Sequence, residues 1–380
     1  MGRANLHIYP SYFTHESRIM KETKSIADAG MFGRIFIGAI FRDDLEEHES
    51  LDSSREVWRA PVRMNGFADG SLWKVFKILE WTFKIFFRFR QADIAVVHCH
   101  GLATLPIGIL FRLFKKSRIV YDAHELETER EGMSFLRRRL SKIAERIFIK
   151  FTDAVMVVSD SIAGWYKDRY GLRQIYIVKN IPYGRQVAGE SDLLKKRFDI
   201  PPNEMLFLYQ GVLDSGRGIT ILLEAFSKLD ESDHIVFMGY GPMEDMIKDH
   251  DERFRNIHFQ PAVPPEQLAR YTKSADIGIS LIENSCLSYY YSLPNKLFEY
   301  MLCGLPMIVS DFPDMGGLVD SEECGWKVSV DVESVLQLIN GLSKKDIIDK
   351  KKNVMRCREN YSWEKEEQKL LKAYRDLKDV

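Results

Sequence analysis

The sequence has few cysteines and no motif that would use them. Only five occur among 380 residues, and none forms a Cys-x-x-Cys pair. An odd number of widely spaced cysteines argues against a disulfide framework or a structural zinc site, and it favours a reducing compartment. Excess charge is also missing, since 54 Lys and Arg oppose 55 Asp and Glu for a net charge of −1. This balance excludes a strongly basic nucleic-acid binder and an acidic disordered tail.

Targeting and membrane-spanning patterns are missing as well. The first residues, MGRANLHIYP, lack the basic-then-apolar order of a signal peptide. Residues 94–111 contain no Lys, Arg, Asp or Glu. This uncharged stretch is about as long as a membrane-spanning helix needs to be. Two histidines, two glycines and a proline interrupt it, so a buried strand, a turn and the start of a buried helix explain it better. We therefore expect a cytoplasmic protein.

The sequence does contain a regular alternation of short apolar runs and longer helical stretches. Such runs lie at residues 34–40 and 118–122 in the first half, and at 206–210 and 307–310 in the second. Apolar strands that alternate with helices are typical of parallel sheets covered on both faces. The pattern runs twice, with an aperiodic break at residues 179–189. It predicts an α/β fold of two tandem doubly wound domains, with the ligand site in the cleft between them.

Two glycine-containing segments of the second half are candidates for a phosphate site. The segment LYQGVLDSGRGITILLEAF is a strand, a glycine loop and a helix, and its Arg217 adds a positive charge to the anion-binding start of that helix. The segment FMGYGPMED ends a strand with Gly239 and Gly241. These glycines either allow close approach to a ligand or simply make the turn.

A third segment, SLIENSCLSYYYSLPNKLFEYMLCGLPMIVSD, leads through Pro294 and Asn295 into a helix. The first turn of this helix carries Lys296 and Glu299. A carboxylate near a helix start is favoured by the dipole, so a plain capping role for Glu299 stays open.

In this order, the three segments resemble the nucleotide-sugar glycosyltransferases of the GT-B fold, glycosyltransferase family 4 (group 1). YDAHE in the first half and Trp363 in the closing YSWEKEEQKLLKAY extend the resemblance over nearly the whole chain. It implies two Rossmann-like domains that face a central cleft. We expect an acceptor-side domain at residues 1–182, a donor-binding domain at 183–360, and a C-terminal helix at 361–380 that returns toward the N-terminal domain.

The resemblance also implies site residues. Arg217 and Lys296 would hold the donor diphosphate, Glu299 would accept hydrogen bonds from the ribose, and His124 would face the donor sugar. The predicted catalytic residues are His124, Arg217 and Lys296, and the predicted donor-binding residues are Gly211, Gly239, Gly241, Tyr291, Pro294, Asn295 and Glu299.

Two positions depart from the family pattern. Val212 stands where the family usually has an arginine that contacts the diphosphate, and Tyr291 stands where it often has a first glutamate facing the donor sugar. One of two cations and one of two carboxylates are therefore missing. A non-catalytic member of the family is an alternative that rests on these two residues.

Histidines gather at predicted strand ends of the first half. His124 follows a strand and has acids nearby, so it suits a general base, a metal ligand or a hydrogen-bonded loop residue. No second histidine lies four residues away, so its spacing for a metal is poor, and we expect no metal site. His15, Arg18 and His100 are weaker candidates for the acceptor side.

A basic aromatic helix is the most distinctive feature of the first half. Residues 72–90 hold seven aromatic residues, five cations and one acid. A second helical stretch, SFLRRRLSKIAERIFIKF, groups Arg137, Arg138 and Arg139. Core packing explains one face of such a helix. Basic amphipathic helices also bind anionic membranes, so we expect contact with the inner face of the cell membrane.

The resemblance implies a retaining hexosyltransferase that uses a UDP- or GDP-sugar and a glycan or lipid-linked acceptor hydroxyl, with no protein nucleophile, cofactor or metal. Bacterial surface polysaccharide or glycolipid assembly is the expected setting. A sugar-nucleotide epimerase shares the fold and is a second alternative. A nicotinamide-dependent dehydrogenase is disfavoured, since no G-x-G-x-x-G follows the first strand.

Overall fold

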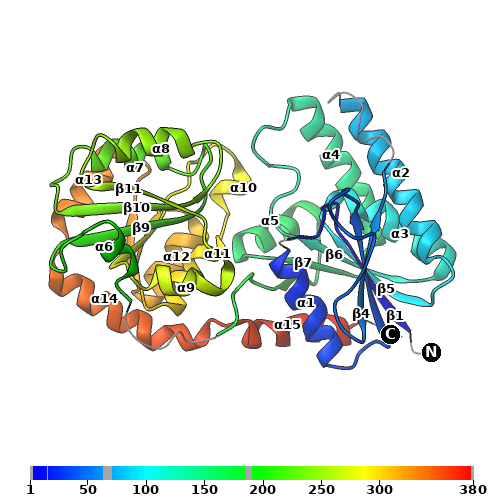
Figure 1. Ribbon diagram of the computed structural model, residues 1–380. Helices are drawn as coiled ribbons and strands as arrows, with labels where there is room; N and C mark the ends of the chain where they lie inside the picture. Colours follow the sequence, from blue (N-terminus) through cyan, green and yellow to red (C-terminus); the bar gives the residue numbers. More distant parts are fainter. Residues whose placement is uncertain (1–2, 15, 63–70, 185–190, 378–380) are drawn as a thin grey trace. The chain divides into compact units, whose positions relative to one another are not determined.

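A computed structural model of the chain describes residues 3–14, 16–62, 71–184 and 191–377, and it consists of two compact units (Figure 1). Unit 1 comprises Met1–Lys179 and Glu366–Val380, and unit 2 comprises Asn180–Lys365. Each unit has one predominantly parallel sheet with helices on both faces, which confirms the predicted class of two Rossmann-like α/β domains. The chain leaves unit 1 after Lys179, within the aperiodic segment.

Unit 1 is built on an eight-stranded sheet in the order β3-β4-β2-β1-β5-β6-β7-β8. β3 pairs antiparallel with β4, and the other pairs are parallel. The strands are β1 (Ala4–Ile8), β2 (Arg34–Ile40), β3 (His48–Ser50), β4 (Arg55–Ala60), β5 (Ile94–His100), β6 (Arg118–Ala123), β7 (Ala154–Val157) and β8 (Tyr176–Ile177), and the helices are α1 (Ser17–Asp28), α2 (Ser71–Phe89), α3 (Leu105–Lys115), α4 (Phe135–Phe148), α5 (Asp160–Tyr170) and most of α15 (Trp363–Arg375).

Alternate residues of β5 point to opposite faces of this sheet, as the pleat requires. Cys99 faces α3, where Gly108 leaves room for it, since a Cβ on Gly108 would lie 2.8 Å from the Cys99 sulfur. His98 and His100 face the other way, toward α1 and α15. This second face is lined with buried polar groups rather than with apolar side chains alone.

Unit 2 is built on a six-stranded parallel sheet in the order β11-β10-β9-β12-β13-β14. Its strands are β9 (Met205–Val212), β10 (Asp233–Tyr240), β11 (Ile257–Pro261), β12 (Ile277–Ser280), β13 (Met307–Ser310) and β14 (Gly325–Val328), and its helices are α6 (Leu193–Arg197), α7 (Ile219–Phe226), α8 (Glu244–Asp251), α9 (Pro265–Thr272), α10 (Leu287–Tyr290), α11 (Asn295–Leu302), α12 (Pro313–Glu322), α13 (Val332–Gly341) and α14 (Lys344–Cys357).

Helix α11 is locked to the middle of this sheet by Tyr300. The buried Tyr300 hydroxyl lies 3.0 Å from the carbonyl oxygen of Leu208 and 3.1 Å from that of Ile279, and it accepts the Gln210 N–H at 3.2 Å. Gly278 makes this contact possible, because a Cβ there would lie 2.4 Å from the Tyr300 ring. The start of α11 is thereby held at the carboxyl end of β9.

None of the helices in the described ranges is long and apolar enough to cross a membrane. Residues 94–111 form β5, a short turn and most of α3, as the sequence indicated.

Candidate functional site

The carboxyl end of the unit 2 sheet presents two helix starts whose backbone donors are only partly used. Helix α7 follows a loop in which Gly216 and Gly218 have positive φ angles of 73° and 68°, and Gly211, near the end of β9, has a φ angle of 120°. The Gly218 N–H donates to Glu283, and no side chain caps α7 further. Helix α11 starts after Pro294 without a side-chain cap. Both starts therefore offer N–H groups and a positive dipole end to an anion.

Arg217 lies in the loop before α7 and is held by an aromatic ring. Its guanidinium carbon lies 5.5 Å from the Tyr289 ring centroid. Its Nε is buried and has no hydrogen-bond partner among the described residues. A buried donor on a charged group is costly when it is unmatched. The position is therefore suited to an anionic ligand.

Lys296, in the first turn of α11, is the second cation of this site. It is 9% exposed, and its Nζ lies 3.7 Å above the centroid of the Tyr209 ring. Burial and, to a smaller extent, the nearby Arg217 lower its pKa to about 7, while Glu299 opposes the shift. Two cations thus lie close together in a partly desolvated place, an arrangement that a diphosphate would stabilise.

Glu299 is oriented by a chain of polar contacts one turn further along α11. Its Oε2 accepts the Gln210 side-chain N–H at 2.5 Å, and the Gln210 Oε1 accepts the Thr272 hydroxyl at 2.8 Å. The carboxylate is half-buried and keeps further acceptor capacity. A ligand with vicinal hydroxyls fits such an acceptor.

The glycines of the second segment have a structural reason that the sequence did not reveal. A Cβ on Gly239 would lie 1.8 Å from the Gly211 carbonyl oxygen, and one on Gly241 would lie 2.3 Å from that of Leu213. Both glycines therefore let the ends of β9 and β10 approach each other. Their contact with a nucleotide remains a prediction.

The two departures from the family pattern flank this site without adding charge. Val212 is 39% exposed at the end of β9. Tyr291 is half-buried after α10, its ring centroid 5.4 Å from that of Tyr290. Asn295 is exposed at the start of α11. A pocket of about 540 Å³ lies at the ends of β12, β13 and β14, and Glu283, Tyr290 and Asp311 are among its lining residues.

Binding of a diphosphate at this site is expected to weaken as the pH rises above 7. The free protein loses the Lys296 charge around its pKa of about 7. A bound diphosphate favours the ammonium form, so binding takes up a proton. The Kd for UDP should rise above pH 7 by at most about tenfold per pH unit.

Calorimetry in buffers of different ionisation enthalpy measures the proton uptake on binding. Lys296→Arg, charged at every pH, should abolish the slope, and a flat wild-type profile contradicts the prediction.

In unit 1, His124 is held by an anchored carboxylate. Its Nε2 lies 3.1 Å from Asp122 Oδ2, and its side chain is 24% exposed. Asp122 is fully buried and accepts two Arg18 hydrogen bonds of 2.9 Å each, from Nε and Nη2. Burial alone would raise the pKa of Asp122, but Arg18, His124 and His100 together hold it well below its usual range. His124 is thus oriented by a permanent anion.

The weaker acceptor-side candidates have other surroundings. Arg18 is 5% exposed and also donates to the Val178 carbonyl, and His100 is 1% exposed with its Nδ1 3.1 Å from His124 Nε2. Their polar atoms are engaged by interior partners, so the structure makes them supports of His124 rather than surface groups. His15 lies outside the described residues.

Several residues of these sites carried no signal in the sequence. Tyr209, Gln210 and Tyr289 contact the candidate residues Lys296, Glu299 and Arg217, and His7 and Glu22 join His98 and His100 in the interior of unit 1. Tyr209 and Gln210 lie in β9, Tyr289 in α10, His7 in β1 and Glu22 in α1, so no spacing rule connects them with the residues that the motifs single out. Only the three-dimensional fold brings them together.

Two family models match most of the chain. Residues 204–345 match the family model "Glycosyl transferases group 1", and residues 37–181 match "Glycosyltransferase Family 4". A chitobiosyldiphosphodolichol beta-mannosyltransferase of Kluyveromyces lactis is 22% identical over 350 residues, which cover 82% of this chain and 76% of the relative. The putative colanic acid glycosyl transferase WcaI of Escherichia coli is 24% identical over 170 residues, covering 43% and 41%.

Solved structures share the fold over the full length. Sucrose-phosphate synthase from Thermosynechococcus elongatus superposes with a TM-score of 0.81 at 16% identity, covering 99% of both chains. The lipopolysaccharide glycosyltransferase WaaG gives 0.71 at 14% identity, covering 99% of this chain and all of WaaG. Anabaena HepE in complex with UDP-glucose gives 0.75 at 12% identity, covering 98% and 100%.

Proposed function

Because the chain belongs to the group 1 glycosyltransferases of the GT-B fold, we propose that it moves a sugar from a UDP- or GDP-sugar to an acceptor hydroxyl with retention of configuration. The observation that carries the proposal is the pair Arg217 and Lys296 beside the starts of α7 and α11. Positive charge fixed where the diphosphate leaves is the main need of this reaction.

The residues take distinct roles in this proposal. Arg217 and Lys296 neutralise the departing diphosphate, with the backbone donors of α11 beside it. Glu299 accepts hydrogen bonds from the ribose, the Asn295 N–H faces the β-phosphate, and Tyr291 takes the position that faces the donor sugar in the family. The family resemblance assigns His124 to the donor sugar. No protein nucleophile is required, since the acceptor hydroxyl attacks from the side that the diphosphate leaves.

A ligand panel tests the donor. UDP, GDP, ADP and NAD at millimolar concentration are compared by thermal shift, where a ligand at 100 times its Kd stabilises by about 2.7 kcal/mol. A selective shift with UDP or GDP is expected. HepE has been solved with UDP and with UDP-glucose, which favours UDP. No shift with any nucleotide would favour the non-catalytic alternative, and sugar isomerisation without an acceptor would favour the epimerase.

Arg217→Ala and Glu299→Ala are each expected to lower kcat/KM for the donor by at least about tenfold, or 1.4 kcal/mol. The first removes charge from the diphosphate and the second removes an acceptor for the ribose. Initial rates with a radiolabelled donor measure both. Wild-type kcat/KM in both variants would refute the site, and Glu224→Ala, on the exposed side of α7, is the control.

The anomeric outcome decides the mechanism. Retention is expected, and proton NMR of the first product reports it. The anomeric configuration has to be measured because the matched relative from Kluyveromyces lactis is named as a beta-mannosyltransferase. An inverted product would contradict retention and would instead assign the oriented His124–Asp122 pair as general base.

We also propose that the transfer needs no metal. One Asp-x-Asp pair occurs, Asp249 and Asp251, but it lies at the end of α8, where residues two apart do not face each other. Asp251 accepts the Phe259 N–H. Unchanged rates after chelation of divalent cations are expected, and a loss that Mg²⁺ or Mn²⁺ restores would overturn the proposal.

The setting that we propose is glycan or glycolipid assembly at the inner face of the cell membrane. An apolar face on unit 1 supports it. Helix α3 packs against both α2 and α4, and these three helices expose a set of large apolar side chains. This apolar face consists of Phe76, Leu79, Phe83 and Phe87 of α2, Leu113 and Phe114 of α3, and Leu136, Leu140, Ile143 and Ile147 of α4.

The spacing and rim of the apolar face fit a lipid surface. The α4 residues recur at intervals of four, three and four, so they form one stripe along the helix. Exposed cations border it: Arg88, Arg90, Lys115, Lys116, Arg137, Arg139 and Arg146. Exposed apolar area of this extent marks an interaction site, and each nearby cation adds about 1 kcal/mol on an anionic membrane.

Vesicle flotation tests the apolar face. The protein is expected to float with phosphatidylglycerol vesicles at low salt and to do so far less with phosphatidylcholine. Leu140→Glu with Ile143→Glu should abolish flotation, because the charges lie in the stripe. Ile348→Glu, at an exposed apolar position of α14 in unit 2, should leave it unchanged. Equal flotation of all variants, or none for the wild type, contradicts the proposal.

A further inference from the structure

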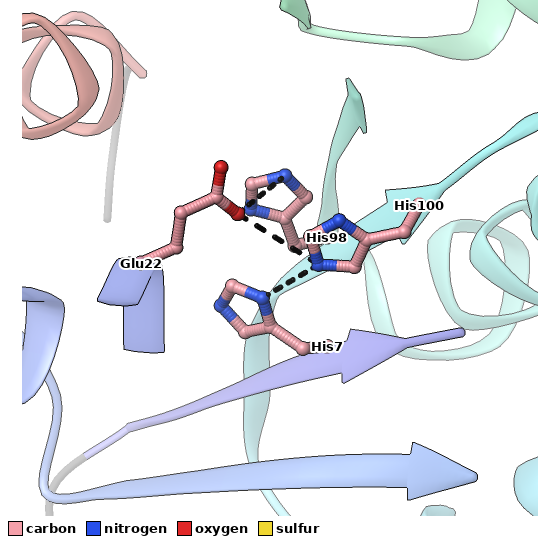
Figure 2. A group of neighbouring side chains, drawn as sticks. All are labelled: His7, Glu22, His98 and His100. Carbon is pink, nitrogen blue, oxygen red and sulfur yellow. Dashed lines mark hydrogen bonds and ion pairs between the residues drawn. The ribbon is translucent and has the colours of Figure 1, made fainter. Parts of the chain in front are cut away.

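Four metal-ligating side chains converge inside unit 1, away from the diphosphate site. Figure 2 shows His7 from β1, His98 and His100 from β5 and Glu22 from α1 pointing toward one another. Each is at most 1% exposed, and one ligand atom of each lies within 4.8 Å of all the others. We propose that these four residues bind one structural zinc ion.

The separations between the ligand atoms come near those around a tetrahedral ion. His7 Nδ1 lies 2.9 Å from His100 Nε2, and Glu22 Oε2 lies 3.9 Å from both His98 Nε2 and His100 Nε2. Zinc bonds of about 2.0–2.1 Å place neighbouring ligands about 3.3–3.4 Å apart. The observed values lie on both sides of this spacing. The His98 and His100 rings are stacked, with planes 10° apart, so forming the site requires these rings to rotate and Glu22 to move about half an ångström closer.

The outer nitrogens of the histidines have the partners that zinc ligands need. Asn5 donates its amide to the Val96 carbonyl, so its Oδ1 accepts from His7 Nε2 at 2.7 Å. His98 Nδ1 lies 2.7 Å from the Tyr374 hydroxyl, and His100 Nδ1 lies 3.3 Å from the Asp122 carboxylate. Such outer contacts hold the ring and leave the inner nitrogen free to ligate.

A chain of hydrogen bonds is the competing arrangement. His124 would donate to His100 Nδ1, His100 Nε2 to His7 Nδ1, and His7 Nε2 to Asn5. This chain satisfies His7 and His100 only. It leaves His98 Nε2 and both Glu22 oxygens buried without a hydrogen-bond partner among the described residues, although Glu22 lies beside the Arg18 guanidinium. A metal ion accounts for all four residues at once.

The types of ligand atom indicate the kind of ion, and the number of protein ligands indicates its role. Imidazole nitrogens with one carboxylate suit zinc among the available divalent metals. Four protein ligands leave no open position, which is typical of structural rather than catalytic zinc. A second group, His100, Asp122 and His124, shares His100 but offers three ligands rather than four. Its Asp122 accepts two Arg18 hydrogen bonds, whereas Glu22 has a single 2.9 Å ion pair with Arg18. The ion would join β1, β5 and α1 and leave the diphosphate chemistry metal-independent.

Metal analysis of the tag-free protein tests the site. The protein is dialysed against ZnCl₂, freed of excess metal and measured by inductively coupled plasma mass spectrometry, with about one zinc per chain expected. Stripping with dipicolinate should lower the melting temperature, and ZnCl₂ should restore it. Co²⁺ in place of zinc should give the visible absorption of a tetrahedral site. These three readings use the wild type alone.

Variants then locate the ion. Glu22→Gln preserves shape, and His98→Gln removes a nitrogen ligand; each should weaken zinc binding at least about 100-fold. The matched control is His258→Gln, which removes a buried histidine from the His234–His258 pair of unit 2 and should keep the full stoichiometry. Zinc below about 0.1 per chain in the wild type, without a zinc-dependent melting shift, would overturn the proposal in favour of the hydrogen-bonded chain. Equal zinc in Glu22→Gln and the wild type would overturn it too.

Discussion

Replacing Lys296 by methionine is expected to lower kcat/KM for the nucleotide-sugar donor by about 10²- to 10³-fold. The ammonium lies on the Tyr209 ring in a nearly closed environment, where a charge interacts with an anion more strongly than in water. Methionine keeps the length and apolar stem of lysine, so it fills the same space without the charge. The effect should appear in the chemical step, because charge on the diphosphate grows as the sugar leaves.

The measurement is a donor titration with single-turnover rates, and it has two controls. Lys296→Arg should recover part of the rate, since it keeps the charge but changes the geometry. Lys228→Met, the same change in an exposed ion pair of unit 2, should leave kcat/KM within about twofold. Wild-type rates in Lys296→Met, with melting unchanged, would mean that the diphosphate binds elsewhere.

Replacing Arg18 by methionine is expected to lower the free energy of unfolding of unit 1 by about 3–5 kcal/mol. Arg18 makes a two-bond contact with Asp122 and lies 2.9 Å from Glu22, and all three side chains are buried. The large cost arises because the variant keeps two carboxylates in the interior and removes the guanidinium between them. Protonation of those acids would relieve only part of it.

Calorimetric unfolding measures the change, and two variants make it specific. Arg18→Met with Asp122→Asn should recover part of the loss, because the second change removes one stranded charge. Arg34→Met breaks an exposed pair with Glu56 and should cost less than about 1 kcal/mol. An Arg18→Met protein as stable as the wild type would show that the buried pair contributes no net stabilisation.

The sequence predicts more of the fold than of the sites. Strands such as β2 and β13 are continuous apolar runs, and they form where that pattern indicates. The apolar pattern does not predict strand β4, REVWRA, because charged residues interrupt it, yet its Arg55 and Arg59 are buried against local polar partners. Patterning reports burial of apolar groups only, so it does not show a strand that buries arginines.

The candidate site of unit 2 and the histidine cluster of unit 1 also differ in how far the sequence predicts them. Arg217, Lys296 and Glu299 stand in short motifs around single turns, where a sequence motif and a local shape nearly coincide. The ring under Lys296 and the ligands around His98 depend on strand register, which pairs His7 with His98 across β1 and β5. No local signal encodes a register between distant strands.

The division of unit 1 along the chain has a consequence for biosynthesis. Tyr374 of α15 is fully buried against Phe32 and His98, and Glu367 accepts the Ser25 hydroxyl at 2.6 Å. When β8 leaves the ribosome, Tyr374 and Glu367 have not yet been synthesised, because the whole of Asn180–Lys365 is translated before them. At 5–20 residues per second, this delay is about 10–40 s. During that time α15 does not yet cover the face of the unit 1 sheet that carries the histidines. The half of the enzyme that is synthesised first is therefore completed last, and it is the half on which chaperones would act.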